Sequence, residues 1–181
     1  MRYNVLGLDI WTGEEGLEVY EEIHENHWNR ALHIAFLAFV YLGVYRGIPA
    51  ILGITDYRSK WIIGGIMSIY GAFYATFDQI GALWTILCNL PMGIIAYKQL
   101  ANSPQISRWH HVKISMLFML SALLLQEVVG HTLWEEVNSR MTFSYVLNAI
   151  MYSPLYCSRY IWTYFPYSVI PTLIYINSLL N

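Results

Sequence analysis

Long apolar stretches dominate this sequence and restrict what it can fold into. Residues 31–54, 61–77, 80–97 and 114–137 are each close to the length of a membrane-spanning helix, and few charges interrupt them. Hydrophobic residues make up 56% of the 181 residues and charged residues only 12%, which is well below the charge of a soluble domain. The sequence therefore predicts an all-α fold, a polytopic membrane helical bundle of about four to six hydrophobic helices.

The two ends of the chain are predicted to belong to the same single domain, residues 1–181. Residues 1–30 are predicted to form an amphipathic N-terminal helix, because residues 13–28 carry an apolar stripe at helical spacing with most glutamates outside it. His24 and His27 fall on that stripe and are expected on its buried side. Residues 141–180 are predicted as C-terminal hydrophobic helices, whose number the sequence leaves open.

The charge pattern excludes one large class of function. The net charge is −2, and no Lys/Arg-rich tract occurs. Nucleic acid is therefore not an expected partner, whereas the lipid bilayer is.

An ionisable cluster ends the last of the four apolar stretches. Its apolar run continues into Glu127, His131 and Glu135. Spacings of four residues place these three side chains on one face of a helix. Ionised groups at membrane depth are unfavourable without partners, so this face is predicted to point into the protein and to mark a site.

The number of membrane crossings decides which histidines can meet. If residues 31–54 cross once, the N-terminal histidines lie on the same side as His131, and His110 and His111 lie opposite, about 25 Å away along a helix. If residues 31–54 form a re-entrant hairpin, the pairing inverts. The single crossing is preferred because it gives His131 partners of matching chemistry. It also gathers most loop lysines and arginines on one side, which the positive-inside rule would make cytoplasmic.

The segment from His24 to His33 is the densest polar stretch of the chain. Nine positions separate these two histidines, so one continuous helix would point them to opposite faces. A break is needed if both serve one site. Asn29 is predicted to provide it, as the N-cap of a new helix that starts at Arg30.

Three imidazoles with carboxylates nearby suit a divalent transition metal. His24, His33 and His131 are the predicted ligands, since the single crossing brings them to one side. The ordinary alternative, in which a histidine bonds to a loop or to lipid head groups, is preferred for the other three histidines, which are expected at interfaces and in a loop over residues 98–113.

Two motifs carry a resemblance to a known family: His24-x4-Asn29-x3-His33 ahead of an apolar segment, and Gly130-His131-x3-Glu135 at the end of a later one. They are similar to those of the small membrane-embedded 2-hydroxy fatty acid dioxygenases. That family is known from fungal phytosphingosine degradation in the endoplasmic reticulum and has bacterial relatives. The similarity covers residues 20–156. It implies an integral membrane protein of the endoplasmic reticulum in a eukaryote, or of the inner membrane in a bacterium.

The resemblance implies an Fe(2+)-dependent α-oxidation. Dioxygen would cleave the C1–C2 bond of a 2-hydroxy long-chain fatty acid and leave a chain one carbon shorter. The three histidines would hold the iron. Glu135 would be a fourth ligand or would orient an imidazole, and Glu127 would contact the ligands without binding the iron itself. Asn29 belongs to the implied catalytic set. Arg30 would pair with the substrate carboxylate or extend to the interface, and the acyl tail would lie between residues 61–97 and the main helix.

The chain departs from the family pattern at three positions. His27 replaces a proline, Glu127 stands where the family has glutamine, and the proline after Glu135 is missing. These departures leave three alternatives to the family's activity: a different substrate, a different metal, or a relative that has lost the activity. Two other functions compete: a different histidine-box lipid oxygenase, for which six histidines are few, and a non-enzymatic membrane scaffold or transporter-like protein.

Overall fold

The computed structural model describes residues 2–5, 8–11, 18, 21–22, 24–76, 78–134, 151–157 and 159, with backbone alone for residues 2–5 and 8–11. The predictions for Glu135 and for most of residues 141–180 therefore lie outside the described residues. Residues 151–157, within the predicted C-terminal hydrophobic helices, are helical.

Helices form nearly all of the described chain. They are α2 (His27–Ile51), α3 (Ser59–Ala75), α4 (Gln79–Ala101), α5 (Arg108–Leu123), the π-helical segment η1 (Leu124–Gly130) and α6 (His131–Trp134). The last three are continuous and form one rod. The predicted all-α membrane bundle is confirmed, with one addition: a short antiparallel ribbon of strands β1 (Arg2–Val5) and β2 (Leu8–Trp11) precedes it.

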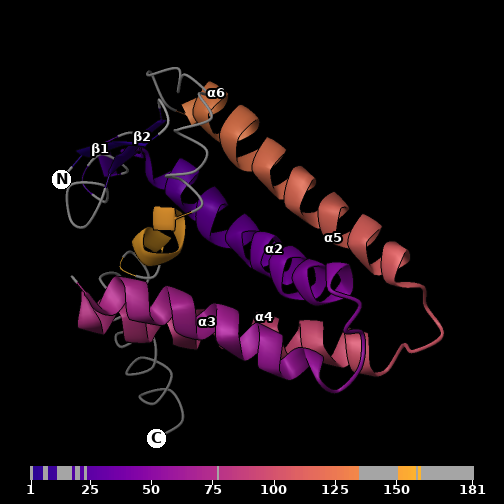
Figure 1. Cartoon of the computed structure of the whole chain (residues 1–181). Helices are drawn as coiled ribbons and strands as arrows, with labels where there is room; N and C mark the ends of the chain where they lie inside the picture. Colours follow the sequence, from indigo (N-terminus) through magenta and orange to yellow (C-terminus); the bar gives the residue numbers. More distant parts are fainter. Residues whose placement is uncertain are drawn as a thin grey trace, which may run out of the picture.

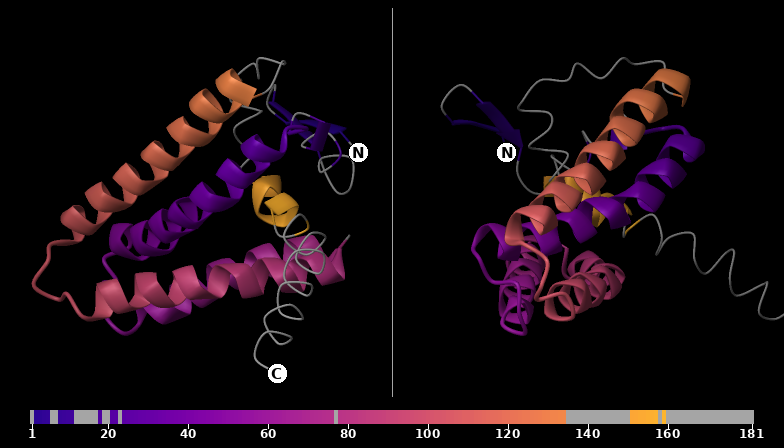
Figure 2. Two further views of the ribbon diagram at one scale, coloured as in Figure 1. Left: turned by 180° about the vertical axis from the view of Figure 1, so that it is seen from behind. Right: turned by 90° about the vertical axis from the view of Figure 1, so that its right-hand side faces the viewer.

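Helix α2 is the centre of the bundle. The rod of α5, η1 and α6 packs along one side of it, and the α3–α4 pair packs on the other (Figures 1 and 2). The helix of residues 151–157 lies between these two groups near the amino-terminal end of α2. This arrangement leaves the beginning of α2, α6 and residues 151–157 at the same end of the molecule.

Within the part of the chain that the structure describes, three helical segments are long and apolar enough to cross a membrane: His27–Ile51, Gln79–Ala101 and Arg108–Trp134. Helix α3 has 17 residues, somewhat fewer than the roughly 20 that span a bilayer. Large apolar side chains cover the outer surfaces, and Trp61 and Trp109 are exposed near the first turns of α3 and α5. This surface is that of a membrane-embedded protein.

The predicted N-terminal helix over residues 1–30 is wrong at both ends. Residues 2–5 and 8–11 form strands, which suits their β-branched and aromatic content, and α2 begins at His27. Glu18, Glu21, Glu22 and Glu25 are exposed, as a solvated face requires. His27 is also exposed, contrary to the expectation that it lies on the buried side.

Helix α2 runs unbroken past Pro49, so the re-entrant alternative is wrong and the chain crosses the bundle once here. Its N-cap is Asn26, whose side-chain oxygen accepts a hydrogen bond from Trp28 N at 2.9 Å. The prediction that Asn29 caps a helix starting at Arg30 is therefore wrong by three residues. The predicted loop over residues 98–113 is present but shorter than expected, because α4 continues to Ala101 and Ser107 caps α5.

Small residues allow α2 and α5 to approach closely. A side chain at Gly43 would meet the Ser115 carbonyl oxygen at 2.8 Å and also the Met119 side chain, and one at Gly47 would meet Ser115 Cβ at 3.2 Å. The two glycines are four apart and lie on one face of α2. This small-x3-small spacing is typical of helix pairs that associate in a membrane.

Asp78 joins the α3–α4 turn to the C-terminal region. It caps α4 by accepting from Gly81 N at 2.8 Å, and its other carboxylate oxygen accepts from the Arg159 guanidinium. Burial acts to raise the pKa of the Asp78 carboxyl, but the Gly81 hydrogen bond and the Arg159 charge outweigh it and leave that pKa below its usual value.

We expect Asp78 to make the stability of the fold depend on pH in the acidic range. A depressed folded-state pKa stabilises the fold above the unfolded value of about 3.9, and this contribution is lost as pH falls through the folded value. The melting temperature of the wild type should therefore drop more steeply between about pH 4 and pH 3 than that of Asp78→Asn. Asp56→Asn, at an exposed ion pair with Arg58, is the control and should follow the wild type. Parallel curves for Asp78→Asn and the wild type would contradict the assignment.

Candidate metal centre

Three imidazoles converge at the end of the bundle where α2 begins. One potential ligand atom from each of His24, His33 and His131 lies within 4.8 Å of the others, and the three side chains form the histidine cluster. The ring centroids are 4.4, 4.8 and 5.6 Å apart. All three residues are buried, with at most 3% of their surface exposed. The single crossing thus brings together the histidines that the sequence analysis grouped on one side.

The spacing of the cluster suits a shared metal ion. The Nε2 atoms of His24 and His33 are 3.2 Å apart. Two imidazole nitrogens bound to one ion at about 2.1 Å, at tetrahedral or octahedral angles, lie about 3.0–3.4 Å from each other. The same distance also permits a hydrogen bond between a protonated and an unprotonated nitrogen. The His24–His33 pair therefore has the spacing of two ligands on one ion, and the group of three imidazoles could hold a transition metal.

His24 reaches the cluster because it stands outside α2. Residues 24 and 25 have no helical structure, and Asn26 has the extended backbone of an N-cap. The His24 carbonyl oxygen accepts hydrogen bonds from Tyr156 Oη at 3.2 Å and from Arg30 Nε. The break required for His24 and His33 to meet is present, and it lies before His27.

The π-helical segment η1 places His131. Its wider turn precedes His131 directly and buries Gln126, Glu127 and Gly130. Gln126 donates from Nε2 to the His33 carbonyl oxygen at 3.0 Å, which ties η1 to α2. A side chain at Gly130 would meet the Asn29 amide oxygen, so only glycine lets the two segments come this close.

Glu127 is the carboxylate closest to the cluster within the described residues. Its Oε2 atom is 3.7 Å from His131 Nε2, and the residue is 8% exposed. A carboxylate at this position can orient an imidazole or strengthen it as a ligand. Glu135, the other predicted carboxylate, lies outside the described residues.

The remaining predicted residues have different surroundings. Asn29 is buried against Gly130, inside the first turn of α2. Arg30 donates to the His24 carbonyl and lies 6.0 Å from the Tyr156 ring centroid. This places Arg30 where it positions a predicted ligand, whereas the sequence analysis assigned it to substrate or to the interface.

The remaining histidines are elsewhere. His27 and His110 are exposed. His111 is fully buried at the opposite end of the bundle and accepts a hydrogen bond at Nδ1 from Arg46 Nε at 3.1 Å. Arg46 also donates to Gln99 at 3.2 Å. His111 is thus a structural residue between α2, α4 and α5, and its expected place in a wet loop is wrong.

Sequence reasoning missed Gln126 and Tyr156. Both hold a histidine backbone carbonyl, and neither has a spacing that sets it apart from an ordinary core residue. Gln126 offered one weak signal, since an amide within an apolar membrane helix usually has a partner. Tyr156 offered none, because fifteen tyrosines occur in the chain.

We expect Arg30 to act through His24. Arg30→Lys removes the Nε donor but keeps the charge, so it should lower the affinity of the histidine cluster for a divalent metal by about tenfold. Metal titration would measure the change. Glu25→Gln, at an exposed neighbouring position, is the control and should keep the wild-type affinity. An unchanged metal affinity in Arg30→Lys would contradict this role.

No protein-family model, curated protein or solved structure matches this chain. The functional assignment therefore depends on the chemistry and geometry of the histidine cluster and of the cavity next to it.

Proposed function

We propose that this membrane protein is an Fe(2+)-dependent dioxygenase that shortens 2-hydroxy fatty acids by one carbon. The observation that carries the proposal is the buried cluster of three imidazoles at the end of a membrane-spanning bundle. Buried imidazoles without a metal would be an unusual use of three polar side chains in a membrane protein. A neighbouring apolar cavity supplies the place for an acyl chain.

His24, His33 and His131 would hold the iron, with Glu127, or Glu135 beyond the described residues, as the supporting carboxylate. Sets of histidine and carboxylate ligands with open positions are typical of non-haem iron oxygenases. When bound, iron would supply a Lewis acid for the carboxylate and 2-hydroxyl of the substrate and a binding position for dioxygen. The protein residues contribute orientation, since hydrogen bonds hold the backbone of both His24 and His33.

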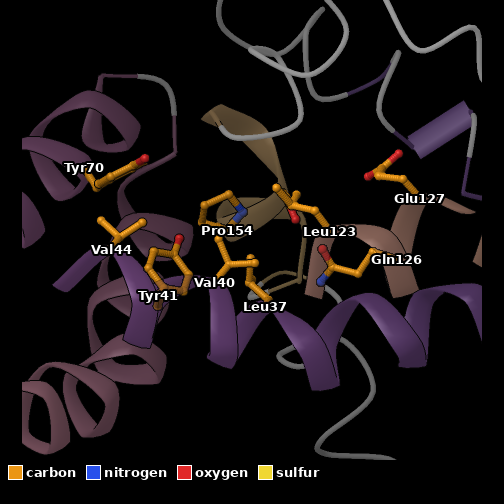
Figure 3. Close-up of a pocket in the computed structure, with 10 residues that line it drawn as sticks. Leu37, Val40, Tyr41, Val44, Tyr70, Leu123, Gln126, Glu127 and Pro154 are labelled. Carbon is orange, nitrogen blue, oxygen red and sulfur yellow. The ribbon is translucent and has the colours of Figure 1, made fainter. Parts of the chain in front are cut away.

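The acyl chain would occupy a cavity that begins next to the histidine cluster. Glu127 and Gln126 border one end of it and Tyr41 and Tyr70 border the other (Figure 3). Aliphatic side chains, Pro154 and the polar Ser153 complete the lining. The cavity volume is about 40 Å³. A second cavity of about 90 Å³ shares Leu37 and Tyr41 with the first and gives room for the tail to continue.

The reaction balances without another reductant. A 2-hydroxy acid and one dioxygen give the shortened acid, carbon dioxide and water. The C1–C2 bond breaks, C2 is oxidised to a new carboxyl group, and the substrate supplies all four electrons that reduce dioxygen. The fold therefore needs no electron-transfer partner for this chemistry, which sets it apart from a desaturase.

Turnover under defined conditions tests the proposal. Protein loaded with Fe(2+) without oxygen should convert 2-hydroxypalmitate to pentadecanoate on exposure to air, with one dioxygen consumed and one carbon dioxide released per product. Palmitate, which lacks the 2-hydroxyl, should consume no oxygen. Iron-loaded protein that binds 2-hydroxypalmitate without forming pentadecanoate would overturn the assignment.

A non-enzymatic scaffold is the second candidate, because several buried polar groups join helices. Gln126 links η1 to α2, and Arg46 links α2 to α4 and α5. A scaffold would show no stoichiometric metal.

Zinc in place of iron would keep the metal site but exclude dioxygen chemistry, since zinc has no redox activity.

A further inference from the structure

The cavity beside the histidine cluster contains a polar group that a plain acyl chain would not satisfy. Tyr41 is 4% exposed, and its hydroxyl has no hydrogen-bond partner among the described residues. In Figure 3 this hydroxyl points towards the space between Tyr70 and Pro154, which border the same cavity. A buried hydroxyl nearly always has a partner, and an oxygen atom of a bound ligand would supply one at this position.

Two other buried tyrosines of the bundle have hydroxyls with hydrogen-bond partners. Tyr74 is fully buried, and its hydroxyl donates to the Met151 carbonyl oxygen. Tyr156 donates to the His24 carbonyl. Tyr41 thus differs from its neighbours, and it is the one of these three that borders the cavity.

The position of Tyr41 along α2 sets the distance from the metal centre. Eight residues separate it from His33, which corresponds to about 12 Å along the helix. Leu37, Val40 and Ser153 also line this cavity, and the Ser153 side chain already hydrogen-bonds with the Cys157 side chain. A ligand with its carboxyl end at the cluster would therefore reach the Tyr41 hydroxyl in the middle of its chain.

We infer that the cavity selects acyl chains that carry a second oxygen, as a hydroxyl or oxo group, in the middle of the chain, where it hydrogen-bonds to Tyr41. The inference rests on the proposed function for the orientation of the chain, with its carboxyl end at the histidine cluster. It names a substrate class, an acid oxygenated at the 2-position and again near mid-chain. Tyr41 is the specificity-determining residue, and Tyr70 is the second phenol at that end of the cavity.

Binding without turnover tests the inference. The probes are 2-hydroxypalmitate and a series of 2-hydroxypalmitates with a second hydroxyl at successive positions from mid-chain to the methyl end. Dissociation constants are measured by calorimetry in detergent under nitrogen. One or two adjacent mid-chain positions should bind about 2- to 10-fold more tightly than 2-hydroxypalmitate, which is the effect of one added hydrogen bond.

Tyr41→Phe should remove this preference, so that 2-hydroxypalmitate and its mid-chain hydroxylated forms bind this variant with similar dissociation constants. Tyr57→Phe, at an exposed loop position, is the matched control and should keep the wild-type preference. Tyr41→Phe should also melt at the wild-type temperature or higher, because it removes an unpaired buried hydroxyl. A lower melting temperature would show that the hydroxyl already has a partner and would overturn the inference.

The outcomes separate this inference from the proposed function. Turnover of 2-hydroxypalmitate with no mid-chain preference, or with a preference that survives in Tyr41→Phe, would overturn the inference alone. A preference that depends on Tyr41, in a protein that consumes no oxygen, would support the binding site and overturn the dioxygenase.

Discussion

Replacement of His131 by alanine is expected to remove the metal and the activity together. The variant should lose more than about 100-fold in metal affinity, because loss of a supporting residue alone typically costs 10- to 100-fold. His24→Ala and His33→Ala should have the same effect, since one potential ligand atom from each of the three imidazoles lies within 4.8 Å of the others. Metal per protein, measured by mass spectrometry after gel filtration, and pentadecanoate formation are the two readouts.

Matched histidine variants provide the control for this experiment. His27→Ala and His110→Ala change exposed imidazoles and should keep full metal content. Because His131 is buried, alanine leaves a cavity, so His131→Gln serves as a second variant that keeps the side-chain size. A folded His131→Gln protein with stoichiometric metal would remove His131 from the site.

Substitution of Gly43 by alanine is expected to destabilise the fold by forcing apart the α2–α5 contact. The added Cβ would lie 2.8 Å from the Ser115 backbone oxygen, a group that cannot turn aside. Helices α2 and α5 would have to separate, with a loss of about 1–3 kcal/mol in the free energy of unfolding. Equilibrium unfolding in mixed micelles would measure it.

Gly64→Ala is the matched control, because it adds the same atom inside a helix with nothing within 4 Å. It should stabilise the protein by about 0.5–1 kcal/mol, since alanine loses less conformational freedom than glycine in a helix. Opposite signs for the two variants are the expected result. Equal effects would show that helix propensity, and not the α2–α5 contact, decides the outcome at Gly43.

The membrane class and the grouping of histidines followed from local features of the sequence. Apolar runs of spanning length predicted the bundle, and counting crossings predicted which end each histidine occupies. Such reasoning works because helix length and the order of crossings depend on residues adjacent in the chain. It placed His24, His33 and His131 at one end and His111 at the other, as the structure has them.

The errors fell where helix ends depend on contacts distant in sequence. Asn26 and Asn29 are equally good caps by residue type, but Asn29 is buried against Gly130, and only Asn26 is left to cap α2. Ser107 and Asn102 similarly shorten the loop between α4 and α5. Position along the chain could not distinguish these alternatives.

By itself, the sequence determined that this protein is a helical membrane bundle with imidazoles and carboxylates gathered at one end. Only the tertiary structure decided how that end is built: the break that frees His24, the π-helical turn before His131, and the Tyr41 hydroxyl in an apolar cavity. The physical reason is that helical periodicity specifies which side chains lie on the same face of a helix. The hydrogen bonds of a side chain depend instead on atoms that can lie a hundred or more positions away, as Tyr156 does from His24.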